Sequence, residues 1–468
     1  MNEKKEKKVK SKSYLLIIAI SIAVIGVFFF LFLLLLGNLS SPLDNMKIPS
    51  YSGKEKPILE AFEKQFSKKE DFIYSSALKG EHRSPVMFID LDNDARDEAL
   101  VFYSLKKAEK NVYIKIMKEN NGSWIAINDI RGNGNKIISV DKLKASSNST
   151  ENYLMIYWDV LGSGKNGLLT VYVPEKYSDK NINLKPLFKQ NILGYTKISI
   201  DENLTPGILF YFINYTEKNI EAYANVFCIE DDRVVTLGDN VKIDNSVNNC
   251  INLQTFKKID GEYIYLDTAN QYNSSLTEIL VWDYKQRKLE SLFTKVGNFS
   301  NYKTLRSVEI ESADIDRDRE PEIPSNKSEY NDDFRDELNY GEELLPVIAW
   351  STVDRNFNLT EKFLTFAETD SGYLMKTDLN KEYKIFAIRN SILGKTEYWT
   401  LRNGKKNKLL FTIYDTELSR YNDNTQNYSD FFIYGAINNK MIMFKITDDG
   451  AKLGINEDYI KSNIENIG

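Results

Sequence analysis

Residues 90–103 read DLDNDARDEALVFY, and this stretch joins two patterns that together indicate the fold. Its first nine residues place carboxylates at positions 1, 3, 5 and 9, which are Asp90, Asp92, Asp94 and Glu98. The five residues that follow, Ala99 to Tyr103, are apolar without interruption. An apolar run of this length suits a strand that is buried on both faces. The stretch therefore predicts a polar loop that leads directly into a buried strand.

Apolar runs that end in an aromatic residue recur along the chain, and their ends are separated by 55, 54, 70 and 68 residues. After Ala99 to Tyr103 they are Leu154 to Trp158, Ile208 to Phe212, Ile279 to Trp282 and Val347 to Trp350. Several strands per period, with one central buried strand in each, are typical of a propeller blade. We expect residues 57–369 to form a mainly β, propeller-like domain of repeated antiparallel sheets. A β-sandwich or two stacked β domains is the alternative.

From about residue 370 the pattern changes. Four strand-like segments of a single antiparallel sheet are followed by a helix near residues 456–466. The four segments are Lys384 to Ile388, Thr396 to Leu401, Leu409 to Tyr414 and Met441 to Ile446. We predict a small, separate α+β domain at residues 370–468, although this region could instead contribute the last blade or two.

The N-terminal region predicts a single membrane anchor at residues 14–37. Tyr14 to Leu36 contains no charged residue, and a helix of this length spans about 34 Å, enough to cross a hydrocarbon core of about 30 Å. Residues 1–13 carry six Lys, which predicts a cytoplasmic tail and an extracytoplasmic remainder that begins with a polar linker at residues 38–56. The alternative is a cleaved signal peptide, whose apolar region is usually about 7–15 residues long.

The charge and composition of the outer part exclude some functions. Beyond residue 13 the chain holds 55 basic and 65 acidic residues, and this acidic balance argues against nucleic acid as a partner. The single histidine, His82, cannot build a His-rich zinc site, and it lies in a polar stretch and not near a nucleophile signature. Gly162 to Lys165 resembles a phosphate loop only in part, and a hairpin turn is predicted there.

The two cysteines, Cys228 and Cys250, both lie on the predicted outer side. In an oxidising compartment they could form a disulfide that closes a loop of about 22 residues, worth about 3 kcal/mol. Two unpaired, buried thiols are the equal alternative.

A second segment repeats the acidic pattern of the first. Residues 314–322 read DIDRDREPE and again place carboxylates at positions 1, 3, 5 and 9. Alternate side chains of a tight loop turn toward one centre, and Ca²⁺ takes six to eight oxygen ligands at about 2.3–2.6 Å. The candidate ligands are Asp90, Asp92, Asp94 and Glu98 in the first loop and Asp314, Asp316, Asp318 and Glu322 in the second.

With its continuation into the buried strand, the first loop resembles the FG-GAP or VCBS-type repeats of β-propellers, in which DxDxDGxDE precedes a buried strand. More widely, residues 57–468 resemble poorly characterised extracytoplasmic membrane proteins of Gram-positive bacteria built from such repeats. The resemblance implies a propeller-like fold and calcium-stabilised loops, and it implies no established activity.

The sequence departs from that pattern at position 6, where Ala95 and Arg319 replace the usual Gly. A non-glycine residue with positive φ costs on the order of 1 kcal/mol. Arg96, Arg317 and Arg319 could also supply positive charge in place of a metal. We expect these loops to brace the structure and not to perform catalysis.

The sequence leaves two functional hypotheses. The first is a non-enzymatic binding or scaffold protein at the cell surface that recognises cell-wall polymer or a protein partner. The second is a wall-directed glycoside hydrolase, which needs two carboxylates about 5–10 Å apart. Nothing in the sequence selects such a pair from the acidic residues. A concave pocket with two facing carboxylates and aromatic walls would favour the hydrolase.

Overall fold

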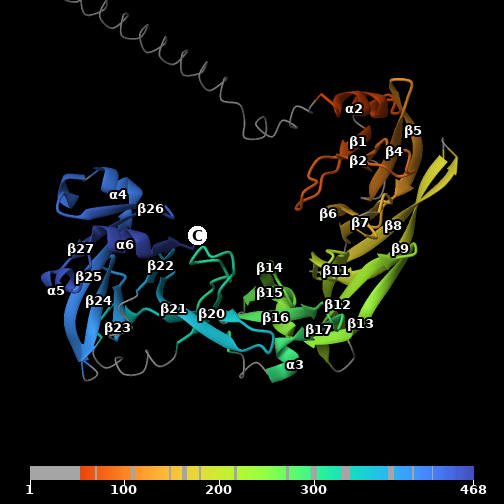
Figure 1. Ribbon diagram of the computed structural model, residues 1–468. Helices are drawn as coiled ribbons and strands as arrows, with labels where there is room; N and C mark the ends of the chain where they lie inside the picture. The colour runs from red at the N-terminus through yellow and green to blue at the C-terminus, as the bar shows by residue number, and fades with distance from the viewer. Residues whose placement is uncertain are drawn as a thin grey trace, which may run out of the picture. The chain divides into compact units, whose positions relative to one another are not determined.

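The computed structural model describes thirteen segments of the chain (Figure 1). They are residues 53–68, 71–106, 111–146, 149–160, 166–178, 181–215, 219–269, 274–296, 303–327, 338–377, 384–402, 405–423 and 425–467. The predicted cytoplasmic tail at 1–13, the transmembrane helix at 14–37 and most of the linker lie outside these residues. Within the described segments, no helix has both the length and the apolar character needed to cross a bilayer.

The chain divides into two compact units. Of the described residues, one unit comprises those within 53–68 and 119–126, and the other comprises those within 71–118 and 127–467. In the first unit, helix α2 spans Lys56–Glu63 and has Pro57 in its first turn. Backbone N–H groups of the first turn have no acceptor within the helix, so the N–H that proline lacks costs no hydrogen bond there. Ile58, Leu59 and Phe62 are buried along one side of this helix.

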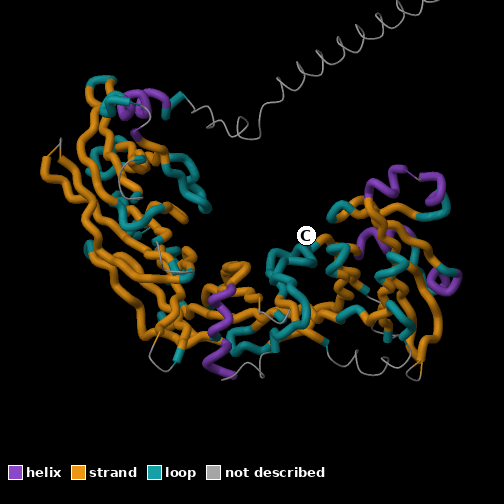
Figure 2. Tube along the Cα trace, turned by 180° about the vertical axis from the view of Figure 1, so that it is seen from behind, coloured by secondary structure: helices purple, strands orange, loops and turns teal. Residues whose placement is uncertain are grey.

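Strands dominate the described residues (Figure 2). The first four antiparallel sheets follow one another along the chain. Sheet one contains β1 (Phe72–Tyr74), β2 (Val86–Ile89), β3 (Glu98–Leu105), β4 (Val112–Asn120) and β5 (Ser123–Arg131). Sheet two contains β6 (Lys136–Leu143), β7 (Tyr153–Asp159), β8 (Gly167–Ser178) and β9 (Asn181–Ile192). Sheet three contains β10 (Gly194–Ser199), β11 (Pro206–Tyr215), β12 (Ile220–Glu230) and β13 (Arg233–Ile243). Sheet four contains β14 (Cys250–Lys258), β15 (Gly261–Ala269), β16 (Ser275–Asp283) and β17 (Lys288–Ser291), and the short helices η2 (Asn245–Asn249) and α3 (Leu292–Val296) flank it in sequence.

Each of the last two sheets contains strands from both sides of residue 370. Sheet five has the order β18-β20-β21-β22-β28, and sheet six has the order β19-β23-β24-β25-β27-β26. The strands of sheet five are β18 (Ile323–Asn326), β20 (Val347–Val353), β21 (Leu359–Glu368), β22 (Tyr373–Lys376) and β28 (Ile464–Asn466). Those of sheet six are β19 (Glu342–Leu344), β23 (Ile385–Asn390), β24 (Lys395–Arg402), β25 (Lys405–Glu417), β26 (Phe432–Ile437) and β27 (Lys440–Ile446).

The four strands predicted for the C-terminal sheet lie together in sheet six, as β23, β24, β25 and β27. Short helices accompany them: α4 (Leu418–Asp423), η7 (Thr425–Tyr428), α5 (Asp448–Lys452) and α6 (Glu457–Asn463). The predicted terminal helix at 456–466 is too long, because residues 464–466 form β28 and pair with β22. Residues on each side of 370 thus contribute to both sheets, and the separate domain at 370–468 stays a prediction.

The five apolar runs each lie in an interior strand of a different sheet: β3, β7, β11, β16 and β20. Strand β7 shows why such a run is apolar throughout. Leu154, Ile156 and Trp158 pack into a cluster with sheet one, whereas Tyr153 and Tyr157 pack into a cluster with sheet three. Successive side chains of a strand point to opposite faces, so burial on both faces requires an apolar residue at every position.

Hydrophobic clusters join each sheet to the next one along the chain. Shared clusters connect sheets one and two, two and three, three and four, four and five, and five and six. Between sheets three and four, for example, Leu209 of β11 and Leu280 of β16 belong to one cluster. The mainly β fold expected from the sequence is therefore confirmed as a series of antiparallel sheets in which neighbours share a core.

The two cysteines are free thiols. Cys228 lies in β12 and is buried, and burial raises the pKa of its thiol to about 12. Cys250 begins β14 in the next sheet, where its Sγ lies 3.1 Å from the carbonyl oxygen of Asn252. The sequence left a disulfide and two unpaired thiols as alternatives, and in the structure the two thiols are unpaired.

Candidate metal centres

The first acidic loop connects β2 to β3 and folds back on its own carboxylates. The backbone N–H of Ala95 donates to Asp90 Oδ2 at 3.0 Å, and that of Leu91 donates to Glu98 Oε2 at 2.9 Å. Ala95 has a φ of 64°, so the residue in the usual glycine position does adopt the left-handed conformation that the pattern requires. The loop therefore keeps the backbone shape of the repeat despite lacking its glycine.

The second loop has the same fold, residue for residue. The N–H of Arg319 donates to Asp314 Oδ2 at 2.9 Å, and that of Ile315 donates to Glu322 Oε2 at 2.9 Å. Arg319 has a φ of 77°. Each contact repeats, at the same sequence offset, a contact of the first loop. The similarity predicted from the spacing of the carboxylates is thus present in the backbone of both loops.

Each loop gathers three carboxylates closely enough to hold a cation. Oxygens of Asp90, Asp92 and Asp94 all lie within 4.8 Å of one another, and so do oxygens of Asp314, Asp316 and Glu322. The remaining predicted ligands, Glu98 and Asp318, lie outside these two groups of three but take part in the lysine contacts described next.

A lysine ammonium binds two carboxylates of the first group together with Glu98. Nζ of Lys118, on β4, lies 2.6 Å from Asp92, 3.1 Å from Asp94 and 2.9 Å from Glu98. Nζ of Lys176, on β8, also lies 2.9 Å from Asp92. The side chain of Asp92 is 0% exposed and that of Glu98 is 1% exposed, so these two carboxylates are shielded from water.

Lys362, on β21, has the same role in the second loop. Its Nζ lies 3.0 Å from Asp316 and 3.0 Å from Glu322, and it also contacts Asp318. The arginines named as alternatives to a metal do not fill this position: Arg317 instead pairs with Glu465 at 3.2 Å. Sequence reasoning missed both lysines, since each lies on a strand 20 or more positions away along the chain and reaches the loop only through strand pairing.

These contacts change the acidities of the carboxyl groups. Burial acts to raise the pKa of Asp92, but hydrogen bonds from Lys118 and Lys176 outweigh it and hold that pKa below its usual value. At Glu98 and Glu322, burial prevails over the lysine contacts and raises the pKa. The pKa of Lys118 is raised, because its carboxylate partners outweigh the effect of burial.

The lowered pKa of Asp92 predicts a specific acid sensitivity. A carboxyl group whose pKa falls on folding stabilises the native state above its unfolded pKa, and this stabilisation is lost as the pH falls through the folded value. We expect wild type to be more stable than Asp92→Asn at neutral pH, with the difference shrinking below about pH 4. Thermal melts of both proteins between about pH 7 and about pH 3 check this. A difference that stays constant over the range would contradict it.

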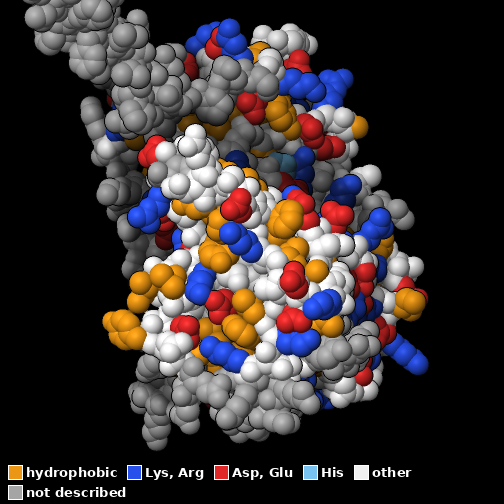
Figure 3. Space-filling view, turned by 90° about the vertical axis from the view of Figure 1, so that its left-hand side faces the viewer, with side chains coloured by type: hydrophobic (Ala, Val, Ile, Leu, Met, Phe, Trp, Pro, Cys, Tyr) orange, Lys and Arg blue, Asp and Glu red, His pale blue; other side chains and the backbone are white. Residues whose placement is uncertain are grey.

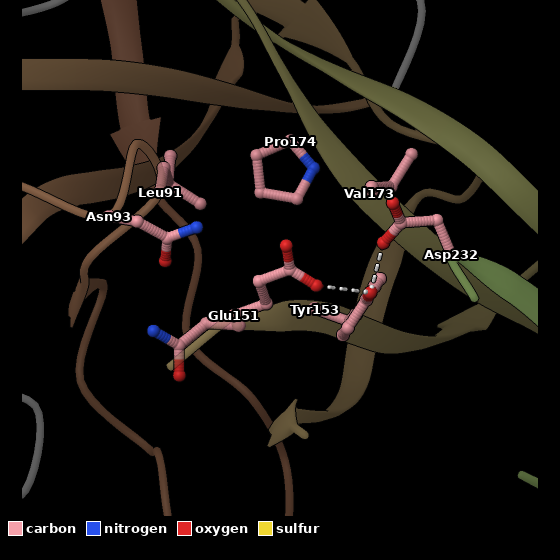
Figure 4. A pocket seen from close by; sticks show the side chains of 8 residues that line it. Leu91, Asn93, Glu151, Tyr153, Val173, Pro174 and Asp232 are labelled. Carbon is pink, nitrogen blue, oxygen red and sulfur yellow. Dashed lines mark hydrogen bonds between the residues drawn. The ribbon is translucent and has the colours of Figure 1, made fainter. Parts of the chain in front are cut away.

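A small pocket lies beside the first loop (Figure 4). It is lined by Asn93 of the loop, by Glu151 and Tyr153 of the segment that enters β7, and by Asp232 of the turn between β12 and β13. The hydroxyl of Tyr153 lies 3.2 Å from Glu151 Oε2 and also contacts Asp232. Two carboxylates, one from the segment that enters β7 of sheet two and one from a turn of sheet three, therefore contact the hydroxyl of Tyr153.

The pocket is smaller than the sites that usually bind small molecules. Its volume is about 100 Å³, whereas small-molecule sites usually occupy about 300–1,000 Å³. Tyr153 holds Glu151 and Asp232 together at the junction of sheets two and three. The arrangement therefore suits bracing of that junction better than cleavage of a glycosidic bond.

No family model and no curated protein match the chain. Solved structures show remote similarity. They include a levansucrase mutant from B. megaterium (10% identity, TM-score 0.25, covering 67% of this chain and 93% of the other). Others are Saccharomyces cerevisiae Sqt1 (11%, TM-score 0.25, covering 74% and 86%) and a Synechocystis ACO mutant (8%, TM-score 0.24, covering 70% and 70%). At these TM-scores the similarities assign neither a fold family nor an activity.

Proposed function

We propose that the protein is a membrane-anchored, extracytoplasmic binding or scaffold protein built on a propeller-like series of sheets. It recognises cell-wall polymer or a protein partner. The observation that carries this proposal is the state of the gathered carboxylates: in both acidic loops they bind a lysine ammonium from the same chain. Carboxylates held in this way brace a loop and are not free to transfer protons to a substrate.

The propeller-like architecture is supported by the repeated sheets. Each of the five apolar runs lies in an interior strand, and adjacent sheets share a core along the chain. The anchor and the outward orientation rest on residues 14–37 and on the lysines before them. On the face shown in Figure 3, basic and acidic side chains are interspersed, which agrees with a partner other than nucleic acid.

Calcium in the acidic loops is part of this proposal. Among the described residues, Asp90 Oδ1 and Asp92 Oδ1 are buried without a hydrogen-bond partner, so the first loop has acceptor capacity that a cation would use. Calcium would supply structural bracing, held by Asp90, Asp92 and Asp94, and Lys118 would have to leave the site. In the second loop calcium would be held by Asp314, Asp316, Asp318 and Glu322, and Lys362, which contacts the last three of these, would have to leave in the same way.

The alternative function, a cell-wall-directed glycoside hydrolase, has one observation in its favour. Glu151 and Asp232 face each other across the hydroxyl of Tyr153, which is the pairing of carboxylates that such an enzyme needs. The volume of about 100 Å³ and the engagement of both groups by Tyr153 argue against it.

A retention experiment separates the two functions. The full chain, purified in a detergent without a sugar head group, is mixed with isolated cell envelopes, washed and eluted. We expect the protein to be retained and no reducing sugar to be released. Release of reducing sugar by wild type that is abolished in Glu151→Gln and in Asp232→Asn would establish the hydrolase. Failure of the wild-type protein to be retained on the envelopes would remove the binding proposal.

A further inference from the structure

A second pocket, in sheet six, is about 420 Å³ in volume and lies within the range of sites that bind small molecules. It opens at the end of the sheet where the turn between β23 and β24 approaches the end of β25 and the segment containing α4 and η7. Its walls combine three aromatic rings, a set of paired charges and an exposed aliphatic rim.

The charged wall is fixed by a buried network. Arg389 of β23 donates to Asp415 of β25, and Nζ of Lys440 lies 3.2 Å from the other oxygen of Asp415. The side chains of Arg389 and Asp415 are 3% and 7% exposed. Burial acts to raise the pKa of Asp415, but Arg389 outweighs it and holds this pKa below its usual value. Asp415 is therefore a fixed acceptor between two donors and not a proton donor.

The net charge of the lining is zero. Its cations are Arg389, Arg420 and Lys440, and its anions are Asp370, Asp415 and Glu417. Such a wall offers donors and acceptors side by side without attracting a free ion of either sign. A ligand rich in hydroxyl groups matches it best, because each hydroxyl both donates and accepts.

The aromatic wall is formed by Tyr414, Tyr428 and Phe431. The rings of Tyr414 and Phe431 meet edge to face with centroids 4.9 Å apart, and Lys445 lies 4.0 Å from the ring centroid of Phe431. These contacts hold the rings in place before any ligand arrives, so little side-chain conformational entropy is lost on binding. A sugar ring has an apolar C–H face that packs against such a wall, together with hydroxyls that reach the charged wall.

The rim carries two aliphatic side chains that are unusually exposed. Ile392 is 66% exposed and Leu393 is 63% exposed, both in the turn between β23 and β24. The turn packs closely against β25: the backbone N–H of Asp415 donates to the carbonyl oxygen of Gly394 at 2.9 Å, and a Cβ added at Gly394 would lie 2.6 Å from the carbonyl oxygen of Asp415. The rim therefore lines the same pocket as the paired charges and is hydrogen-bonded to the backbone of Asp415.

We propose that this pocket binds a neutral saccharide of one to three sugar units. The inference rests on the proposed binding function and names its site and ligand class. The aromatic wall supplies stacking, Asp415 and Arg389 hydrogen-bond the hydroxyls, and Ile392 and Leu393 cover the outer edge of the ligand.

The test is saturation-transfer NMR on the full chain, in a detergent without a sugar head group. The probes are maltotriose and chitotriose as neutral trisaccharides, with trigalacturonate and trilysine as charged controls. We expect transfer to at least one neutral trisaccharide and none to the charged probes. Affinity should fall about fivefold in Tyr428→Ala, from loss of an aromatic contact. It should also fall in Leu393→Ser, whose exposed position leaves folding intact.

Tyr340→Ala is the matched control, because Tyr340 is 95% exposed and does not line the pocket. Its affinity should equal that of wild type. The inference is overturned if no neutral trisaccharide binds, if only the charged probes bind, or if both pocket variants bind as wild type does. Envelope retention that is unchanged in Tyr428→Ala, together with such a result, would reject this pocket and leave the proposed function standing.

Discussion

Replacing Arg306 by Met should lower the free energy of unfolding by about 3–5 kcal/mol, the largest effect we expect from any single substitution away from the hydrophobic core. Arg306 and Asp267 form an ion pair at 3.2 Å in which both side chains are 0% exposed. Removing one member of a fully buried pair leaves the other charge without compensation.

The surroundings of the pair explain the size of the effect. Arg306 also donates from Nε to the carbonyl oxygen of Ile310 at 2.7 Å and from Nη1 to Thr277 Oγ1 at 3.0 Å. Asp267 accepts from both the backbone N–H and the hydroxyl of Ser312, each at 2.9 Å. The network thereby ties β15 and β16 of sheet four to the segment that leads into the second acidic loop.

Chemical denaturation of the full chain, followed by tryptophan fluorescence, measures the change. Arg287→Met is the matched control, because Arg287 pairs with Glu230 at 3.3 Å on the surface, where such pairs contribute about 0–1 kcal/mol. The double variant Arg306→Met/Asp267→Asn should lose less than the sum of the two single variants. Equal losses in Arg306→Met and Arg287→Met would show that the buried network does not stabilise the protein.

Replacing Lys118 by Met should destabilise the protein by about 3 kcal/mol and make its stability depend on calcium. Three carboxylates lose their shared counterion, and two of them, on Asp92 and Glu98, are almost fully buried. A divalent cation can then enter the vacated centre. At a calcium concentration about 100-fold above its dissociation constant, binding to the native state would restore about 2.7 kcal/mol.

Thermal melts with millimolar calcium and with chelator measure this effect. We expect a small calcium-dependent shift in wild type, where Lys118 occupies the site, and a much larger one in Lys118→Met. Lys115→Met is the matched control: Lys115 lies on the same strand and pairs with Asp129 at 2.8 Å, away from the loop. Equal calcium shifts in wild type and Lys118→Met would show that the lysine does not compete with the metal.

The sequence alone predicts the features that depend on a local pattern of residues. Each apolar run lies in an interior strand, because burial on both faces of a strand requires an apolar residue at every position, and that requirement is visible without a partner. The two acidic loops were recognised from carboxylate spacing alone. Positive φ at Ala95 and Arg319 followed from the repeat pattern, and both residues adopt it.

Features that depend on contacts between distant parts of the chain could not be predicted from the sequence. Lys118 and Lys362 look like ordinary surface lysines until β4 and β21 place them at the loops. Arg306 gives no sign of burial, since its partner Asp267 lies 39 positions earlier. The pocket in sheet six depends on the order β25-β27-β26, which places Lys440 beside Asp415. In each case the deciding contact joins residues that are far apart in sequence.

The proposed function requires that the β-rich part of the chain lie outside the cytoplasmic membrane. Protease treatment of intact cells that produce the full chain with an epitope tag at residue 1 tests this requirement most directly. We predict that the described part is digested while a short tagged fragment, containing the anchor, stays protected. A chain that remains whole while other surface proteins are cleaved, or a mature chain that begins beyond residue 40, would contradict it.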